Sequence, residues 1–292
     1  MKKTMFASAT VMTAVLYSAA MAAPVPSAVD AMIRAAGDDL DTVVKVAKNA
    51  HPQSAAEIDA LVASLQAQRA AEREQRLADA GLFDAWSGEG ELGVAYTTGN
   101  TKDFGVSAAI GLTKDGLRFR HKLRGLVDRQ KTNGVLTRDR SLADYELNYK
   151  FNERLYAYGL GGWERNRFAG YSRRFSESFG AGYSVFDSDD LRLDVTVGPA
   201  FQQTRYIDGR RENEATARAG AELAWAIRDD LKLSETAAVF FGSQWTSTTA
   251  LTFAINDALS SRASFDIIHE NDPPFGRRAT DTATRLSLVY GF

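Results

Sequence analysis

The last twelve residues, 281–292, constrain the fold of this chain more than any other stretch. They read DTATRLSLVYGF, and Leu286, Leu288, Tyr290 and Phe292 all fall on one parity. A period of two predicts a β-strand with one apolar face. An apolar face that ends on a terminal aromatic residue is typical of the strand that closes an outer-membrane barrel, in which every backbone polar group is paired. We therefore expect Leu288, Tyr290 and Phe292 to form a barrel-closing signature that the barrel-assembly machinery binds.

Composition is compatible with this expectation and excludes several kinds of site. The chain has 292 residues, 25% of them charged and 45% hydrophobic, with a formal net charge of -2. Barrel strands escape hydropathy scans because apolar residues occupy only alternate positions. The absence of cysteine excludes disulfides, thiolate metal sites and cysteine nucleophiles. The nearly balanced charge gives no argument for nucleic acid, and we expect no cofactor.

Residues 1–22 have the pattern of a secretory signal peptide. Lys2 and Lys3 form a basic start, residues 5–19 are apolar, and 20–22 (AMA) supply a cleavage site with small residues. A membrane anchor is the weaker alternative, because the apolar run is short and rich in alanine. We expect export across the inner membrane of a Gram-negative cell and a location in the outer membrane.

Residues 23–85 predict a short helical periplasmic segment. Val29, Ile33 and Leu40 recur at helical spacing, and His51-Pro52 interrupts the pattern. Ser54 with Glu57 predicts a capping box at the start of a second helical stretch, which becomes polar all round from residue 66 to 79. The segment could be a tether, or it could bind a periplasmic partner or plug the pore. We favour the tether.

Residues 86–292 predict the barrel itself. A tight turn with Asp, Asn or Glu launches a strand on leucine five times, at 114–117, 152–155, 189–191, 228–231 and 256–259. Six other connections lie between these turns, at 99–101, 130–138, 169–173, 208–212, 243–248 and 271–278. The arms add up to about twelve strands, an even number, as single-chain outer-membrane barrels have. The predicted fold class is all-β: a transmembrane antiparallel β-barrel of about twelve strands behind a short α-helical periplasmic segment.

Parity assigns the two faces of the wall. In most strands an apolar set alternates with a polar set, which predicts a lipid-facing outer surface and a polar lumen. Glu177 and Glu235 break the pattern, which predicts either a bulge or an interfacial position at each. In the strand that follows Leu155, both parities are mixed and the facing stays open. Tyrosine and tryptophan lie largely toward strand ends, as interfacial girdles would.

The most pointed charge feature is a row of four cations on one parity of one strand, opposite a row of acids and amides on the next. Rows of opposite charge on neighbouring strands predict a cross-strand ion ladder. The predicted lumenal ladder comprises Arg118, Arg120, Lys122, Arg124, Asp144, Glu146, Arg192, Asp194, Arg218, Glu222, Arg262, Asp266 and Arg285. It could form a constriction that selects small ionic or sugar solutes, or it could fill a narrow barrel that conducts little.

Two further groups of residues suggest alternatives. His269, beside Glu270 and Asp272, could belong to a receptor or barrel hydrolase site near the outer rim, but no serine in a recognisable setting accompanies it. We therefore expect no enzyme. Arginines at outer strand ends could bridge phosphates of lipopolysaccharide, alongside other outer-membrane lipid, or form an ordinary solvated rim. They are Arg138, Arg140, Arg165, Arg167, Arg173, Arg174, Arg210, Arg211, Arg277 and Arg278.

The opening of the barrel region carries a resemblance to a known family. Residues 86–93 read WSGEGELG and 98–101 read TGNT, and the chain ends on LVYGF. With these motifs, residues 86–292 resemble the domain-of-unknown-function 481 family, often labelled salt-induced outer-membrane proteins. The resemblance implies an outer-membrane barrel with no established substrate and no catalytic residues. We interpret the chain as a structural barrel or narrow pore with a charged lumen.

Overall fold

The computed structural model describes residues 24–79, 81, 84–97, 103–273, 276 and 278–292. The predicted signal peptide 1–22 and the connection 99–101 lie outside the described residues. The chain divides into two compact units, Met1–Arg76 and Leu77–Phe292.

The first unit is a small helical bundle. It contains α1 (Ser27–Ala35), α2 (Leu40–Ala50) and α3 (Ala55–Asp79), with short 3-10 turns η1 (Gly37–Asp39) and η2 (Pro52–Ser54) between them. The apolar positions at helical spacing form its core, which comprises Val29, Ile33, Leu40, Ala47, Ile58 and Leu65. At the predicted capping box, the Ser54 hydroxyl donates a hydrogen bond to the Pro24 carbonyl, 3.4 Å away. None of the described helices has the length and apolarity needed to span a membrane.

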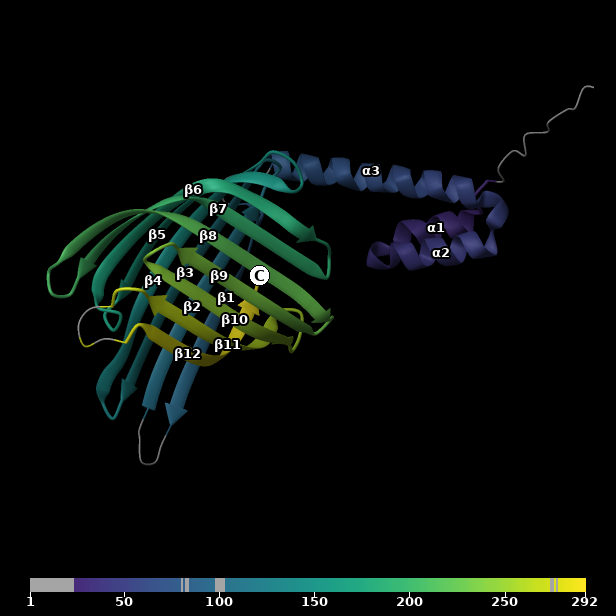
Figure 1. Ribbon diagram of the computed structural model, residues 1–292. Helices are drawn as coiled ribbons and strands as arrows, with labels where there is room; N and C mark the ends of the chain where they lie inside the picture. Colours follow the sequence, from purple (N-terminus) through teal and green to yellow (C-terminus); the bar gives the residue numbers. More distant parts are fainter. Residues whose placement is uncertain (1–23, 80, 82–83, 98–102, 274–275, 277) are drawn as a thin grey trace, which may run out of the picture. The chain divides into compact units, whose positions relative to one another are not determined.

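The second unit is a closed antiparallel barrel of twelve strands, which confirms the predicted fold class (Figure 1). Each strand pairs with its neighbours in sequence, and β12 closes the ring against β1. The strands are β1 (Trp86–Thr97), β2 (Asp103–Asp115), β3 (Phe119–Thr132), β4 (Val135–Lys150), β5 (Leu155–Asn166), β6 (Tyr171–Asp187), β7 (Leu191–Tyr206), β8 (Arg211–Arg228), β9 (Leu231–Phe240), β10 (Gln244–Ala254), β11 (Leu259–Glu270) and β12 (Thr280–Gly291).

Tight turns at one end of the barrel fall where the sequence predicts them. Asn152 accepts hydrogen bonds from the backbone of Arg154 and Leu155, and Asn256 does the same for Ala258 and Leu259. An amide side chain that caps its own turn in this way launches the next strand directly. Four of the five strands that follow the predicted turns begin on leucine, at Leu155, Leu191, Leu231 and Leu259, whereas β3 begins at Phe119, two residues after Leu117.

Two connections at the opposite end differ most from the prediction. In the predicted connection 243–248, residues 244–248 belong to β10, which begins at Gln244. The second is the connection between β3 and β4. Residues 130–138 are not a loop, because β3 continues to Thr132 and β4 begins at Val135. Only Asn133 and Gly134 join the two strands, with φ of 51° and 80°. Two consecutive residues with positive φ make the tight hairpin turn that Asn-Gly favours. As a result, Arg138 lies inside the sheet.

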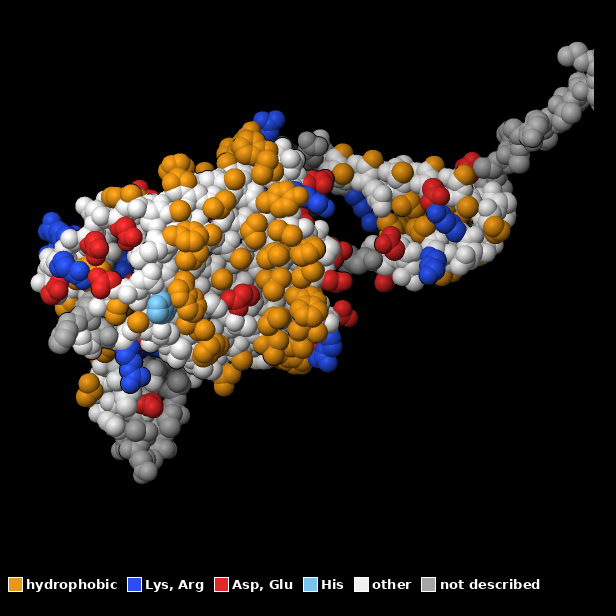
Figure 2. All heavy atoms as spheres, viewed as in Figure 1, with side chains coloured by type: hydrophobic (Ala, Val, Ile, Leu, Met, Phe, Trp, Pro, Cys, Tyr) orange, Lys and Arg blue, Asp and Glu red, His pale blue; other side chains and the backbone are white. Residues whose placement is uncertain are grey.

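The outer face of the barrel is the apolar face that parity predicts. Leu92, Val94, Phe104, Phe179 and Leu286 are among many large hydrophobic side chains exposed on it. Figure 2 shows hydrophobic side chains as a belt across the wall, with charged side chains gathered mainly toward its two ends. An exposed apolar band around a closed sheet is what a bilayer requires. The structure settles the facing of β5, which the alternation of residues left undecided. Tyr156 and Tyr158 are buried on the inner face, and Leu155 is exposed on the outer face.

The two acidic residues that break the pattern do lie on the outer face. Glu177 is exposed between the neighbouring outer residues Phe175 and Phe179. Glu235 accepts hydrogen bonds from Ser247 and Thr249 on β10. Neither residue is at a register shift of its strand, so a bulge does not explain them.

Candidate functional site: the charged lumen

The predicted ladder residues lie on the inner face of the barrel, apart from one. The register aligns Lys122 with Glu146 and Arg124 with Asp144. The Lys122 Nζ lies 3.5 Å from Glu146, and the Arg124 Nη2 lies 2.6 Å from Asp144. Arg118 is the exception, because it is exposed in the turn that precedes β3.

Some lumenal ion pairs cross the barrel instead of following its wall. Lys122 on β3 also binds Glu222 on β8 at 2.7 Å, and these strands lie five places apart in the ring of twelve. Arg120 comes within 3.9 Å of Asp194 on β7, which Arg192 binds at 3.0 Å. A bond between nearly opposite walls occupies the lumen itself, so these pairs narrow the passage at this end of the barrel.

A second tie spans the lumen toward the other end. Arg174 on β6 binds Glu270 on β11 with two hydrogen bonds of 2.8 and 2.9 Å, and it also donates to Gln244 at 2.6 Å. Its guanidinium stacks over the buried Tyr171 ring, 4.1 Å from the ring centre. The Arg174 side chain is only 3% exposed. A bidentate, buried pair of this kind is a fixed cross-link between two walls.

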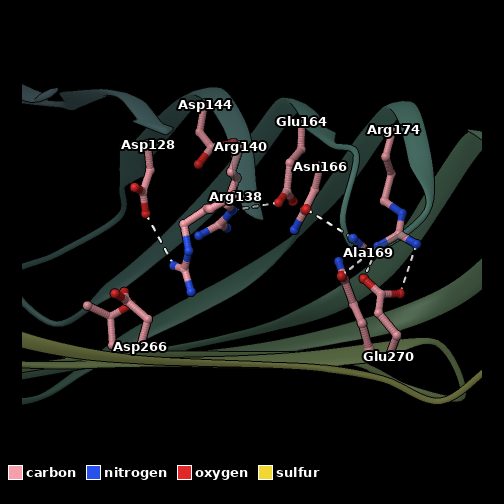
Figure 3. A network of polar contacts seen from close by, with 12 residues as sticks. Asp128, Arg138, Arg140, Asp144, Glu164, Asn166, Ala169, Arg174, Asp266 and Glu270 are labelled. Carbon is pink, nitrogen blue, oxygen red and sulfur yellow. Dashed lines mark hydrogen bonds and ion pairs between the residues drawn. The ribbon is translucent and has the colours of Figure 1, made fainter. Parts of the chain in front are cut away.

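Further ion pairs fill the space between these ties. Figure 3 shows Asp128, Glu164 and Arg174 on one wall, facing Asp266 and Glu270 on the other. Arg140 binds Glu164 at 2.7 Å, and Arg138 binds Asp128 at 3.2 Å. Arg285 binds Asp128 at 3.2 Å and Asp266 at 2.5 Å. Arg262 binds Glu89 at 2.7 Å and Glu91 at 2.9 Å. Arg218 donates a hydrogen bond to Thr196 at 3.2 Å.

Three arginines predicted for the outer rim are lumenal instead. Arg138, Arg140 and Arg174 share the inner face with their partners Asp128, Glu164 and Glu270. They were expected at strand ends because the sequence predicts shorter strands than the structure has. Sequence analysis also missed Glu89 and Glu91 as partners of Arg262, although both stand on the polar parity of β1.

Three of the remaining predicted rim arginines, Arg165, Arg167 and Arg173, gather on one surface. Arg210, Arg211 and Arg278 do not line it, and Arg277 lies outside the described residues. Arg205, which the sequence analysis did not single out, joins them. Arg165, Arg167, Arg173 and Arg205 line a hollow of about 440 Å³ at the ends of β5, β6 and β7, with Ser172 and Tyr206. Arg165 binds Asp139 at 3.0 Å, whereas Arg167, Arg173 and Arg205 are exposed. Four guanidinium groups around one hollow form a site suited to phosphate.

His269 lies among aromatic and hydroxyl groups. Its ring stacks on Trp245 with centroids 5.7 Å apart, and its Nδ1 is 2.8 Å from the Thr280 hydroxyl. These partners belong to the outer face, since Glu270 beside it turns into the lumen. Among the described residues, no three His, Asp or Glu side chains come together as a metal site.

A family model matches most of the barrel region. Residues 90–292 match the model of the family described as protein of unknown function, DUF481. An uncharacterized Escherichia coli (strain K12) protein, YdiY, is 25% identical over 207 residues, which cover 69% of this chain and 82% of the relative.

Solved structures with a similar arrangement include two channels. The NanC porin has a TM-score of 0.43 at 7% identity, over 70% of this chain and 98% of the porin. An outer membrane channel from Pseudomonas putida F1 has a TM-score of 0.43 at 10% identity, over 73% of this chain and 98% of the channel.

Proposed function

This chain belongs to the DUF481 family of proteins of unknown function, and we propose that it is an integral outer-membrane barrel with a lumen narrowed by ion pairs. It acts either as a structural barrel or as a narrow pore for small ions. The observation that carries the proposal is the pair of cross-lumen ties, Lys122 with Glu222 and Arg174 with Glu270. The apolar outer belt supports the membrane location.

Each tie pairs a cation with a carboxylate, and this pairing favours a narrow pore over a wide, open one. Positive groups in the lumen have a carboxylate within ion-pair distance at both ends of the barrel. Such side chains are held by their partners and stay in the passage, where they exclude hydrated solutes. Single-channel recording on purified protein in planar bilayers tests this. Small current steps or no detectable current would support the proposal, whereas large, weakly selective channel openings would contradict it.

The cationic row on β3 gives a prediction about selectivity. If the pore conducts, replacing Arg118, Arg120 and Arg124 with Ser removes two positive charges from the lumen, those of Arg120 and Arg124, and one from the turn before β3. The reversal potential in a salt gradient should therefore shift toward cations. Arg124 is the accessible member, with its side chain 57% exposed. Arg129→Ser is the matched control, because Arg129 lies on the same strand but on the outer parity. An unchanged reversal potential in the triple variant would show that this row does not face the ion path.

The arginine hollow supports lipopolysaccharide as a partner. Arg167, Arg173 and Arg205 would bind phosphate groups of the outer-leaflet glycolipid, in the way guanidinium groups bind phosphate elsewhere. Replacing all three with Gln should lower the amount of lipopolysaccharide that copurifies with the barrel. The control is Arg154→Gln with Arg228→Gln, which removes arginines near the opposite end. Equal retention by both variants would contradict a specific site.

We also propose that the helical unit is a periplasmic tether. Its apolar side chains are already buried in its own core, whereas the second half of α3 is polar on every face. Deleting residues 24–76 should therefore leave the barrel able to fold, as measured by its heat-modifiable mobility on gels. If the folded barrel is lost instead, the helical unit is required for the barrel to fold.

A further inference from the structure

The seam between β1 and β12 is paired over a shorter length than any other seam. Its register runs from Glu89 opposite Gly291 to Gly93 opposite Ser287, which is five aligned pairs. Two hydrogen bonds between Gly88 and Phe292 extend it at the closing end. Every other neighbouring pair of strands is aligned at ten positions or more.

Beyond Gly93 the two strands separate. Val94 continues to pair with Val106 on β2, while Leu286 pairs with Ala263 on β11. Among the described residues, no pair joins β1 and β12 over this part of the seam. In Figure 1 the far ends of β1 and β2 extend away from β12. The edge of β12 facing β1 therefore lacks its ordinary backbone partner along residues 280–286.

A cavity of about 230 Å³ occupies this part of the seam. Val94, Val106 and Leu286 line one end of it, and all three are exposed on the lipid-facing surface. Asp128 and Arg285 line the other end, and both belong to the lumenal network. Residues of both parities therefore line one cavity, which lies within the wall of the barrel at the open part of the seam.

Arg138 replaces the missing strand partner. One nitrogen of its guanidinium donates to the Thr282 carbonyl on the open edge of β12 at 2.7 Å, and another donates to Asp128 at 3.2 Å. Arg138 comes from β4, so it reaches this edge from across the lumen. Its side chain is 23% exposed, compared with 3% for Arg174, so solvent reaches Arg138 more than it reaches Arg174. Breaking one side-chain hydrogen bond to a backbone carbonyl is easier than separating a fully paired strand.

The lumenal end of the cavity has one buried donor that an anion could use. Its charged lining consists of two guanidinium groups, Arg138 and Arg285, and one carboxylate, Asp128, with Asp266 bound behind Arg285. The Nε of Arg285 is buried and has no hydrogen-bond partner among the described residues. A buried donor without a partner is costly and favours a ligand that accepts from it.

From this geometry we propose that the open seam is a lateral portal that binds a single-chain amphiphile with an anionic head group. The head binds Arg138 and Arg285 at the lumenal end, and the acyl chain lies between β1 and β12 against Val94, Val106 and Leu286. The cavity is smaller than the ~300 Å³ or more of common ligand pockets, so it fits one chain and not a lipid with several. The proposal requires a membrane-embedded barrel but not a conducting lumen, so its test is independent of the conductance measurement.

Displacement of a dansyl-labelled fatty acid by dodecanoate tests the portal, with the barrel in phosphatidylcholine nanodiscs. Wild-type protein should bind dodecanoate saturably and dodecanol much more weakly, because the alcohol lacks the charge that the arginines bind. Arg138→Gln should raise the Kd about tenfold, the size expected from a hydrogen bond to a charged group. Leu286→Trp should also raise it, since it covers the lipid-facing mouth.

Matched controls separate the portal from general effects. Leu288→Trp places the same bulk on the same face of β12, two residues along, where the seam is paired with Leu92. Arg124→Gln removes a lumenal arginine outside the cavity. Both controls should keep the wild-type Kd. The proposal is overturned by any of three results: no saturable binding, equal binding of dodecanol, or the same loss in the Leu288→Trp variant.

Discussion

Replacing Glu270 with Gln is expected to lower the free energy of unfolding of the barrel by about 3–5 kcal/mol, the cost of breaking one buried ion pair. The change keeps the shape of the side chain and removes its charge. Arg174 would then remain charged, with its side chain 3% exposed and only neutral hydrogen-bond partners, namely the new amide at position 270, Gln244 and Thr204. Urea unfolding in phospholipid vesicles, followed by tryptophan fluorescence, measures the difference.

Two controls show whether burial is the cause. Asp230→Asn breaks the exposed pair with Arg228 and should change stability by no more than about 1 kcal/mol. The double variant Arg174→Met with Glu270→Met removes both charges, and it should recover most of the loss, because no unpaired buried charge remains. A single Glu270→Gln variant as stable as Asp230→Asn would mean that water reaches Arg174 freely.

The architecture of the barrel was accessible from the sequence because it is encoded locally. A period of two assigns each strand its two faces, and turns such as that of Asn152 cap themselves through contacts three residues long. The family resemblance is confirmed by the match over residues 90–292. The predicted loop at residues 130–138 was wrong because the connection is a two-residue hairpin turn within a longer run of polar residues.

The lumenal network was only half accessible. Parity predicts that Lys122 faces inward, but it cannot reveal that Glu222, a hundred positions away, meets it across the barrel. Cross-lumen partners depend on barrel diameter and strand stagger, which are global properties. Arg174 shows the same limit, since its nearness to a strand end suggested the rim while its partner is on β11. The short pairing at the β1–β12 seam likewise depends on how the ring closes, and the pattern of β12 alone is regular throughout.

Removing both cross-lumen ties at once is expected to raise single-channel conductance several-fold. The quadruple variant Lys122→Ser, Glu222→Ser, Arg174→Ser and Glu270→Ser shortens the four side chains and leaves the net charge of the lumen unchanged. The two ties lie toward opposite ends of the barrel, so they act as resistances in series. Opening one alone should therefore change conductance little, because the other still limits the current. A large, non-additive gain with little change in reversal potential would identify the ties as the constriction, provided that the variant keeps its folded mobility on gels. A quadruple variant that conducts like the wild type would place the barrier elsewhere in the lumen.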